Sequence, residues 1–150
     1  MRHTMTHRAL ATLLLAAWAT ASQAGTCVTS LTDLRLLTRD AAFPLRWTEI
    51  SMSDGKPLVV TIAERDGALF LMFHKTGEGL WAEGPVQVCG KEGDLQARIP
   101  ENLLRVGPAA HWIVRRALRN DARFSLRRDS TGQLAIATAG WSSQFTASGD

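Results

Sequence analysis

The most constraining feature of the sequence is a series of short apolar runs that each end at a turn signal. Between residues 46 and 75 these runs are RWTEISMS, LVVTIAE and ALFLMFHK, and the segments SDGKP and RDG separate them. Short runs rich in β-branched and aromatic residues favour strands, whereas clusters of glycine, aspartate and proline favour turns. The pattern predicts an antiparallel meander that continues through TGEG into residues 80–99.

Helical spacing and a second turn signal follow the meander. Residues 108–119 place apolar side chains on one side of a predicted helix, and Pro108 suits its first turn because proline lacks an N–H. In residues 123–140 the runs RFSLRR and QLAIATAG flank the turn DSTG, which predicts a closing hairpin. A short early helix is also expected, with Thr29 or Ser30 as its cap.

These elements together predict an α+β fold. We expect a meander-like antiparallel sheet of about six to eight strands, packed against the late α-helix, with the short amino-terminal helix as a further element. The sequence contains no internal repeat and no low-complexity tract. One globular domain over residues 25–150 is therefore expected.

The amino terminus predicts export from the cytoplasm. Met1–Arg8 carries two arginines and no acidic residue, and the apolar run ALATLLLAAWA follows over residues 9–19. This run is too short to span about 30 Å of hydrocarbon as a helix, and Ser22 and Ala24 suit a signal peptidase. We therefore expect a signal peptide over residues 1–24, no transmembrane segment in the mature protein, and a periplasmic or secreted location.

The chain has two cysteines, Cys27 and Cys89. In an oxidising compartment an isolated pair usually joins, so we expect a structural disulfide between them. Their spacing is not that of a redox motif, and no histidine lies near either in the sequence. No metal and no cofactor are expected. Attachment of a lipid to Cys27 is a weaker alternative, since the preceding AGT does not fit a lipoprotein cleavage site.

Positive charge is concentrated late in the chain. Residues 98–128 contain eight arginines and two acidic residues, a net charge of +6. The predicted helix stacks several of its basic side chains at a spacing of four, and arginine binds carboxylate or phosphate groups through paired hydrogen bonds. The candidate ligand-binding residues are His111, Trp112, Arg115, Arg116 and Arg119. Arg123, Arg127 and Arg128 are expected on the outward face of the next strand, where they would extend this patch. The alternative is a solvated helix face.

Aromatic residues offer a second candidate surface. Four tryptophans are many for a mature chain of this length, and together with neighbouring apolar residues they would line a pocket for an apolar ligand. The residues concerned are Trp47, Trp81, Trp112, Trp141, Phe70, Met72 and Phe73. The alternative is that they fill the core.

Sequence patterns for catalysis are weak. His74 and His111 are the histidines of the predicted mature chain, and a nuclease with Lys75 as phosphate ligand would use them as acid and base. Glu78 and Glu83 offer two carboxylates, yet nothing in the sequence brings them together. The sequence contains neither a nucleophile elbow nor a glycine-rich phosphate loop. No catalytic residue is assigned, and a non-catalytic function is favoured.

A binding function is therefore predicted. Without Arg2 and Arg8 the net charge falls from +3 to +1, so nucleic acid is not an expected partner. We expect a cell-envelope protein that carries or senses an apolar or amphiphilic anionic molecule, held between the sheet and the late helix. The alternative is a protein-binding module, such as an inhibitor or immunity protein for an exported enzyme. A small exported hydrolase or nuclease is the third hypothesis.

Overall fold

The computed structural model describes residues 26–50, 54–120, 122–138 and 140–148 of the chain. The predicted signal peptide over residues 1–24 lies outside these described residues, as does Asp121 of the basic segment. Within the described ranges, strands greatly outnumber helices.

Eleven strands of the described residues form one antiparallel sheet. Their bounds are β1 Thr26–Val28, β2 Arg46–Glu49, β3 Leu58–Arg65, β4 Ala68–Lys75, β5 Gly79–Pro85, β6 Gln87–Lys91, β7 Asp94–Arg98, β8 Arg105–Val106, β9 Arg123–Arg128, β10 Leu134–Thr138 and β11 Trp141–Ala147. Strands β2 to β5 lie side by side in chain order, as do β9 to β11, and β11 returns to pair with β2. The meander and the closing hairpin predicted from the sequence are both present.

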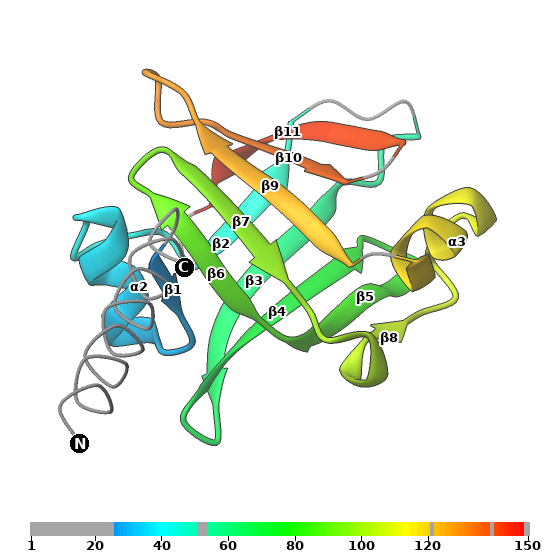
Figure 1. Cartoon of the computed structure of the whole chain (residues 1–150). Helices are drawn as coiled ribbons and strands as arrows, with labels where there is room; N and C mark the ends of the chain where they lie inside the picture. The colour runs from blue at the N-terminus through cyan, green and yellow to red at the C-terminus, as the bar shows by residue number, and fades with distance from the viewer. Residues whose placement is uncertain (1–25, 51–53, 121, 139, 149–150) are drawn as a thin grey trace, which may run out of the picture.

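The sheet curls because β5 and β6 are almost one strand. Only Val86 separates them, and its N–H donates to the carbonyl oxygen of Leu69 at 2.9 Å, so the pairing with β4 continues past the end of β5. Strand β5 pairs with β4 and β8, whereas β6 pairs with β1 and β7. This run therefore joins strands that lie far apart in the sheet order, and Figure 1 shows β7 and β9 crossing in front of β2 and β3.

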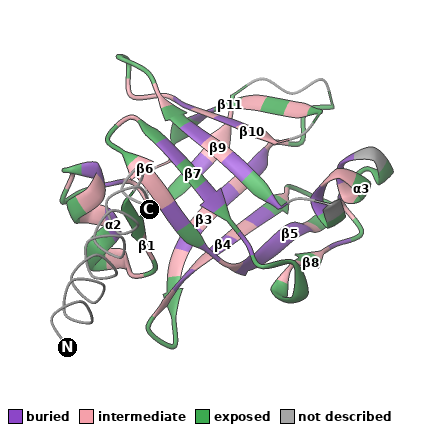
Figure 2. Ribbon diagram, in the orientation of Figure 1, coloured by how far each residue is buried: buried purple, intermediate pink, exposed green. Residues whose placement is uncertain are grey.

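The core fills the inside of this curl. Residues of β3 and β4 alternate between buried and less buried positions, as strands with one inward face require (Figure 2). Phe73 of β4 stacks on Phe124 of β9 with ring centroids 4.8 Å apart, although the two strands are not neighbours in the sheet. Trp47 and Phe145 are also 0% exposed. Aromatic side chains therefore fill the interior between the two layers.

The predicted α+β class is wrong, because the described chain is mainly β. It has eleven strands in place of about six to eight, and its helices α2 and α3 have eight and nine residues. The prediction used a helix to cover the apolar face of the sheet. A curled sheet covers its own inner face instead, so no helix is needed across it. Figure 1 shows α2 and α3 at opposite ends of the molecule.

The early helix α2, Leu31–Thr38, begins at the predicted cap Ser30. The hydroxyl oxygen of Ser30 accepts a hydrogen bond from the N–H of Asp33 at 3.2 Å, which satisfies one of the open donors at a helix start. Leu34 is buried on the side that faces the core. The helix therefore closes one end of the curled sheet.

The late helix α3, Trp112–Asn120, begins four residues after the predicted start at Pro108. The backbone before it follows β5 instead, since the N–H of Gly107 donates to the oxygen of Trp81 and that of Ala109 to the oxygen of Leu80. A Cβ at Gly107 would collide with the Leu80 carbonyl, so this close approach requires glycine. A short 3-10 turn, η2 Glu101–Leu103, precedes this segment.

The predicted disulfide is confirmed. Cys27 of β1 and Cys89 of β6 lie directly opposite each other in the antiparallel pair, with Cα atoms 4.0 Å apart, and their sulfur atoms are bonded. The bond ties β1, and with it the start of α2, to the sheet.

Candidate functional site

The best candidate for a binding site is a cavity at the α3 end of the curled sheet, called here the α3 cavity. It has a volume of about 450 Å³. One wall consists of residues 108–111 and Val114, the segment that leads into α3, and the opposite wall comes from the ends of β2, β4 and β11. The cavity exists because the close approach of residues 107–109 to β5 holds this segment over the open end of the sheet.

Two tryptophans form the aromatic part of the α3 cavity. Trp81 of β5 is 5% exposed, and Trp141 of β11 is half-buried. Their ring centroids lie 5.1 Å apart, and Trp81 also contacts Phe73 of the core at 5.2 Å. These contacts pack the two indole rings together, so the cavity has an aromatic wall that continues into the core.

Charged side chains form another part of the wall, and hydrogen bonds hold several of them. Glu49 accepts from the hydroxyl of Ser143 at 2.6 Å and from the N–H of Leu58 at 3.1 Å. The ammonium group of Lys75 lies 2.7 Å from the Asp54 carboxylate. The hydrogen bond from Lys75 lowers the pKa of Asp54 below its ordinary value, so Asp54 is ionised at neutral pH.

The net charge of the cavity wall follows from these residues. Glu49, Asp54 and Glu78 supply three carboxylates, against the one ammonium group of Lys75, and His111 stands at the wall formed by the α3 segment. The carboxylates of the wall outnumber its ammonium group, so the wall is negative. This is the opposite sign to the outer side of α3.

The five residues predicted to bind a ligand fall into separate places. His111 lines the α3 cavity. Trp112, Arg116 and Arg119 are exposed on the outer side of α3. Arg115 is half-buried, and its guanidinium donates to the carbonyl oxygen of Gly107 at 2.8 Å. The structure thus brings one of the five residues into the cavity and uses another to hold the cavity wall.

The aromatic and apolar residues predicted to line a pocket also lie in different parts of the structure. Trp81 and Trp141 line the cavity, whereas Trp47 and Phe73 are fully buried in the core. Phe70 and Met72 lie half-buried on the opposite face of β4 from Phe73. The Arg65 guanidinium covers them there, 4.1 Å from the Phe70 ring centroid and 3.2 Å from the Met72 sulfur.

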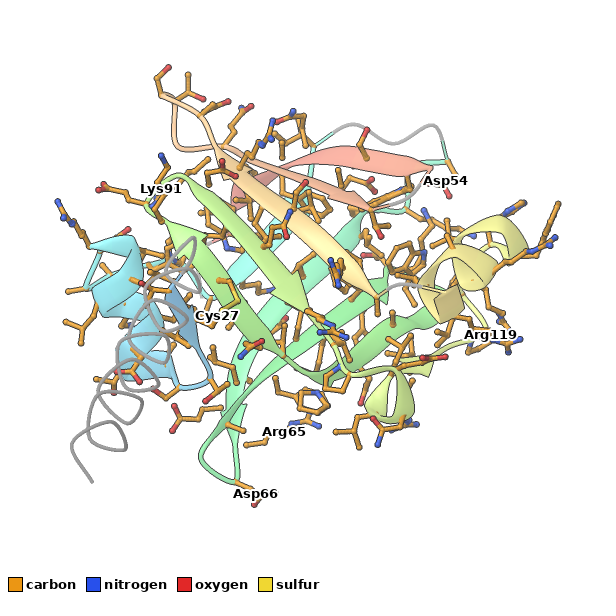
Figure 3. The ribbon with its side chains drawn as sticks, in the orientation of Figure 1. Cys27, Asp54, Arg65, Asp66, Lys91 and Arg119 are labelled. Carbon is orange, nitrogen blue, oxygen red and sulfur yellow. A yellow bond between two sulfur atoms is a disulfide. The ribbon has the colours of Figure 1, made fainter. Side chains whose placement is uncertain are left out.

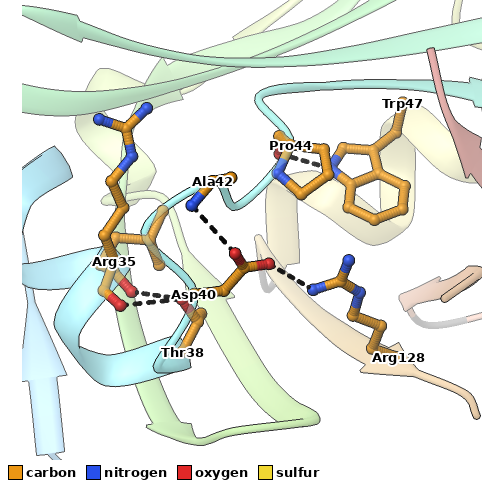
Figure 4. A network of polar contacts seen from close by, with 8 residues as sticks. Arg35, Thr38, Asp40, Ala42, Pro44, Trp47 and Arg128 are labelled. Atoms are coloured by element: carbon orange, nitrogen blue, oxygen red, sulfur yellow. Dashed lines mark hydrogen bonds and ion pairs between the residues drawn. The ribbon is translucent and has the colours of Figure 1, made fainter. Parts of the chain in front are cut away.

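A smaller cavity of about 330 Å³ lies at the other end of the sheet, beneath α2. Arg128 of β9 crosses this end and donates to the Asp40 carboxylate at 2.9 Å (Figure 4). Its guanidinium also lies 5.6 Å from the ring centroids of Phe43 and Trp47. Arg128 therefore faces inward with Leu126. The prediction that it extends the outward patch of Arg123 and Arg127 is wrong.

The ion pair beneath α2 is held by several contacts. The Asp40 carboxylate also accepts from the N–H of Ala42 at 2.9 Å, and the indole N–H of Trp47 donates to the oxygen of Pro44 at 2.9 Å. The hydrogen bond from Arg128 lowers the pKa of Asp40 below its ordinary value. The Asp40 carboxylate is thus already engaged by two donors.

The residues considered for catalysis are not gathered in one place. Lys75 and His111 both line the α3 cavity, whereas His74 is exposed on the other face of β4. Glu83 is buried 3.4 Å from the Arg105 guanidinium, away from Glu78 at the cavity. Among the described residues, no three His, Cys, Asp or Glu side chains come together to hold a metal ion.

The cavity could not be found by a sequence pattern, because its residues come from segments spread between positions 49 and 141. No protein-family model, curated protein or solved structure matches the chain. In the part of the chain that the structure describes, no helix combines the length and the hydrophobicity needed to cross a membrane.

Proposed function

We propose that the protein is a non-catalytic binding protein of the cell envelope and that the α3 cavity is its binding site. The observation that carries this proposal is the cavity of about 450 Å³ with an aromatic wall. Small-molecule sites are commonly concave and mostly apolar, with a few fixed polar groups that orient the ligand. The ligand is a small apolar or amphiphilic molecule whose apolar part lies against Trp81 and Trp141.

The charges around the cavity orient an amphiphile. The carboxylates of Glu49, Asp54 and Glu78 repel an anionic group placed inside, and Lys75 is already paired with Asp54. An anionic end therefore points out of the cavity past His111, toward the side on which α3 carries its arginines. The predicted signal peptide and the disulfide support a location in the periplasm or outside the cell.

A variant that fills the cavity tests this proposal. Ala109 lines the cavity through its methyl group, so Ala109→Phe would occupy the space that a ligand needs. The probe is N-phenyl-1-naphthylamine, an uncharged apolar molecule whose emission rises in apolar sites and which accepts energy from Trp81 and Trp141. We expect the wild-type protein to bind the probe and Ala109→Phe to lose most of this binding while it keeps its melting temperature.

The matched control is Ala41→Phe, which adds the same side chain at an exposed position beside α2. It should bind the probe as the wild type does. Equal binding by the Ala109→Phe variant, or the lack of binding by the wild type, would contradict the proposed site. Native mass spectrometry of the protein recovered from the cell envelope would then identify a molecule that co-purifies with it.

A further inference from the structure

The outer side of α3 is a surface distinct from the α3 cavity. Trp112, Arg116 and Arg119 are spaced by four and three residues, so they share one side of the helix. All three side chains are exposed, and Trp112 is 65% exposed. Figure 3 shows Arg119 at the edge of the molecule beside α3. We call these three residues the α3 outer face.

The α3 outer face belongs to a strongly basic part of the chain. Residues 98–123, which lead from the end of β7 to the start of β9, contain six arginines and two acidic residues, a net charge of +4. They also include Leu103, which is 50% exposed. Glu83 of β5, outside this segment, pairs with Arg105 at 3.4 Å and offsets one of these charges. An exposed indole ring and two exposed arginines on one short helix therefore lie in a segment that remains positive.

The helix at the other end of the molecule lacks this charge. Residues 31–43, which contain α2, carry two arginines and two aspartates and have no net charge. Leu36 is 70% exposed there, so an exposed apolar side chain is common to both helices. The excess of arginine distinguishes α3 from α2.

We propose that the α3 outer face docks on the surface of an anionic lipid bilayer. Tryptophan prefers the headgroup region of a bilayer, and arginines next to it are attracted by anionic lipid headgroups. Tryptophan and arginine are also common in protein interfaces, so an acidic protein partner is the alternative outcome that the experiments below distinguish from a bilayer. This inference goes beyond the proposed function, because docking requires no ligand in the α3 cavity.

Vesicle sedimentation tests the docking. We expect the wild-type protein to bind vesicles that contain phosphatidylglycerol and to bind vesicles of phosphatidylcholine weakly. Arg116→Ala with Arg119→Ala should weaken binding by about 30-fold, since each basic residue near an anionic surface contributes about 5-fold. The control, Arg46→Ala with Arg127→Ala, removes the same charge from two exposed positions on β2 and β9 and should change binding much less.

A second measurement separates a bilayer from a soluble acidic partner. Phosphatidylglycerol vesicles with brominated acyl chains should quench the emission of the wild-type protein, and Trp112→Ala should abolish most of this quenching. Leu36→Ala is the control, and it should leave quenching unchanged. All variants are compared as the predicted mature chain that begins at Gly25, so Trp18 does not contribute to the emission.

Three results would overturn the proposal. The first is no binding of the wild-type protein to phosphatidylglycerol vesicles at physiological ionic strength. The second is an equal loss of binding in the two double-arginine variants, which would indicate general charge attraction. The third is unchanged quenching in Trp112→Ala together with equally tight binding of soluble polyglutamate, which would assign the face to an acidic protein.

Discussion

The two ends of the curled sheet use tryptophan and arginine in opposite ways. At the α2 end, Trp47 is fully buried and the half-buried pair of Arg128 and Asp40 covers it. At the α3 end, Trp81 and Trp141 border a cavity of about 450 Å³, and the arginines of α3 lie outside it. The two ends thus differ in what lies over their tryptophans: a paired arginine covers Trp47, whereas Trp81 and Trp141 line a cavity.

The largest difference between the two ends should appear in stability. Trp47→Ala removes a fully buried indole together with its contact to Phe43, whose ring centroid lies 6.0 Å away. Removal of a buried aromatic side chain typically costs about 3–5 kcal/mol of the free energy of unfolding. Trp141→Ala removes a half-buried ring and should cost about 1–2 kcal/mol. Urea denaturation of the two variants measures both values.

The two substitutions should affect the affinity for the uncharged probe in the opposite order to their effect on the free energy of unfolding. We expect Trp141→Ala to lose probe affinity, since its ring lines the α3 cavity, and folded Trp47→Ala to retain it. Equal destabilisation by the two substitutions would show that the two ends do not differ in packing.

A smaller effect should appear at acidic pH. Because Arg128 lowers the pKa of Asp40 in the folded protein, the folded state binds this proton less tightly than the unfolded state does. The pair therefore stabilises the fold above about pH 4, the ordinary pKa of an aspartate, and this stabilisation is lost as the pH falls through the lowered pKa. We expect Asp40→Asn to lower the urea midpoint at pH 7, and the difference from wild type to shrink below about pH 4.

Asp54 at the α3 end provides the comparison for this measurement. Its pKa is also lowered, through the hydrogen bond from Lys75, but its side chain is 44% exposed against 30% for Asp40. Solvent screens the more exposed pair more strongly, so Asp54→Asn should change the urea midpoint less. A difference between Asp40→Asn and wild type that stays constant between pH 7 and pH 3 would contradict the role given to the ion pair.

The sequence predicted strands well where their apolar residues alternate. The runs that became β3 and β4 carry this alternation, and the turn at RDG separates them as expected. Strand β11 was missed because WSSQFTA has only Trp141 and Phe145 as large apolar residues. Its pairing with β2 depends on contacts across the whole chain, and no local pattern carries that information. The curl of the sheet, and with it the fold class, could therefore not be predicted from local sequence patterns.

The candidate site was predictable only in part, for a related reason. Helical spacing correctly placed a basic helix late in the chain, but it could not show that residues 107–110 follow β5 instead of beginning the helix. Because α3 begins at Trp112 and not at Pro108, His111 lies at the cavity and Trp112 lies outside it. Hydrophobic periodicity also gave no means to distinguish Trp47 of the core from Trp141 of the cavity wall.

The smallest expected effect separates neighbouring arginines of α3. The Arg115 guanidinium donates to the oxygen of Gly107 and so holds the segment that forms one wall of the α3 cavity. Arg115→Ala should lower the free energy of unfolding by about 0.5–1.5 kcal/mol, the usual value of one hydrogen bond, and should also weaken binding of the uncharged probe. Arg116 is exposed, so Arg116→Ala should change stability by less than about 0.5 kcal/mol and leave probe binding unchanged. Urea denaturation and probe titration of both variants measure these effects. Equal behaviour of the two variants would contradict the separation of α3 into a side that supports the cavity and an exposed outer face.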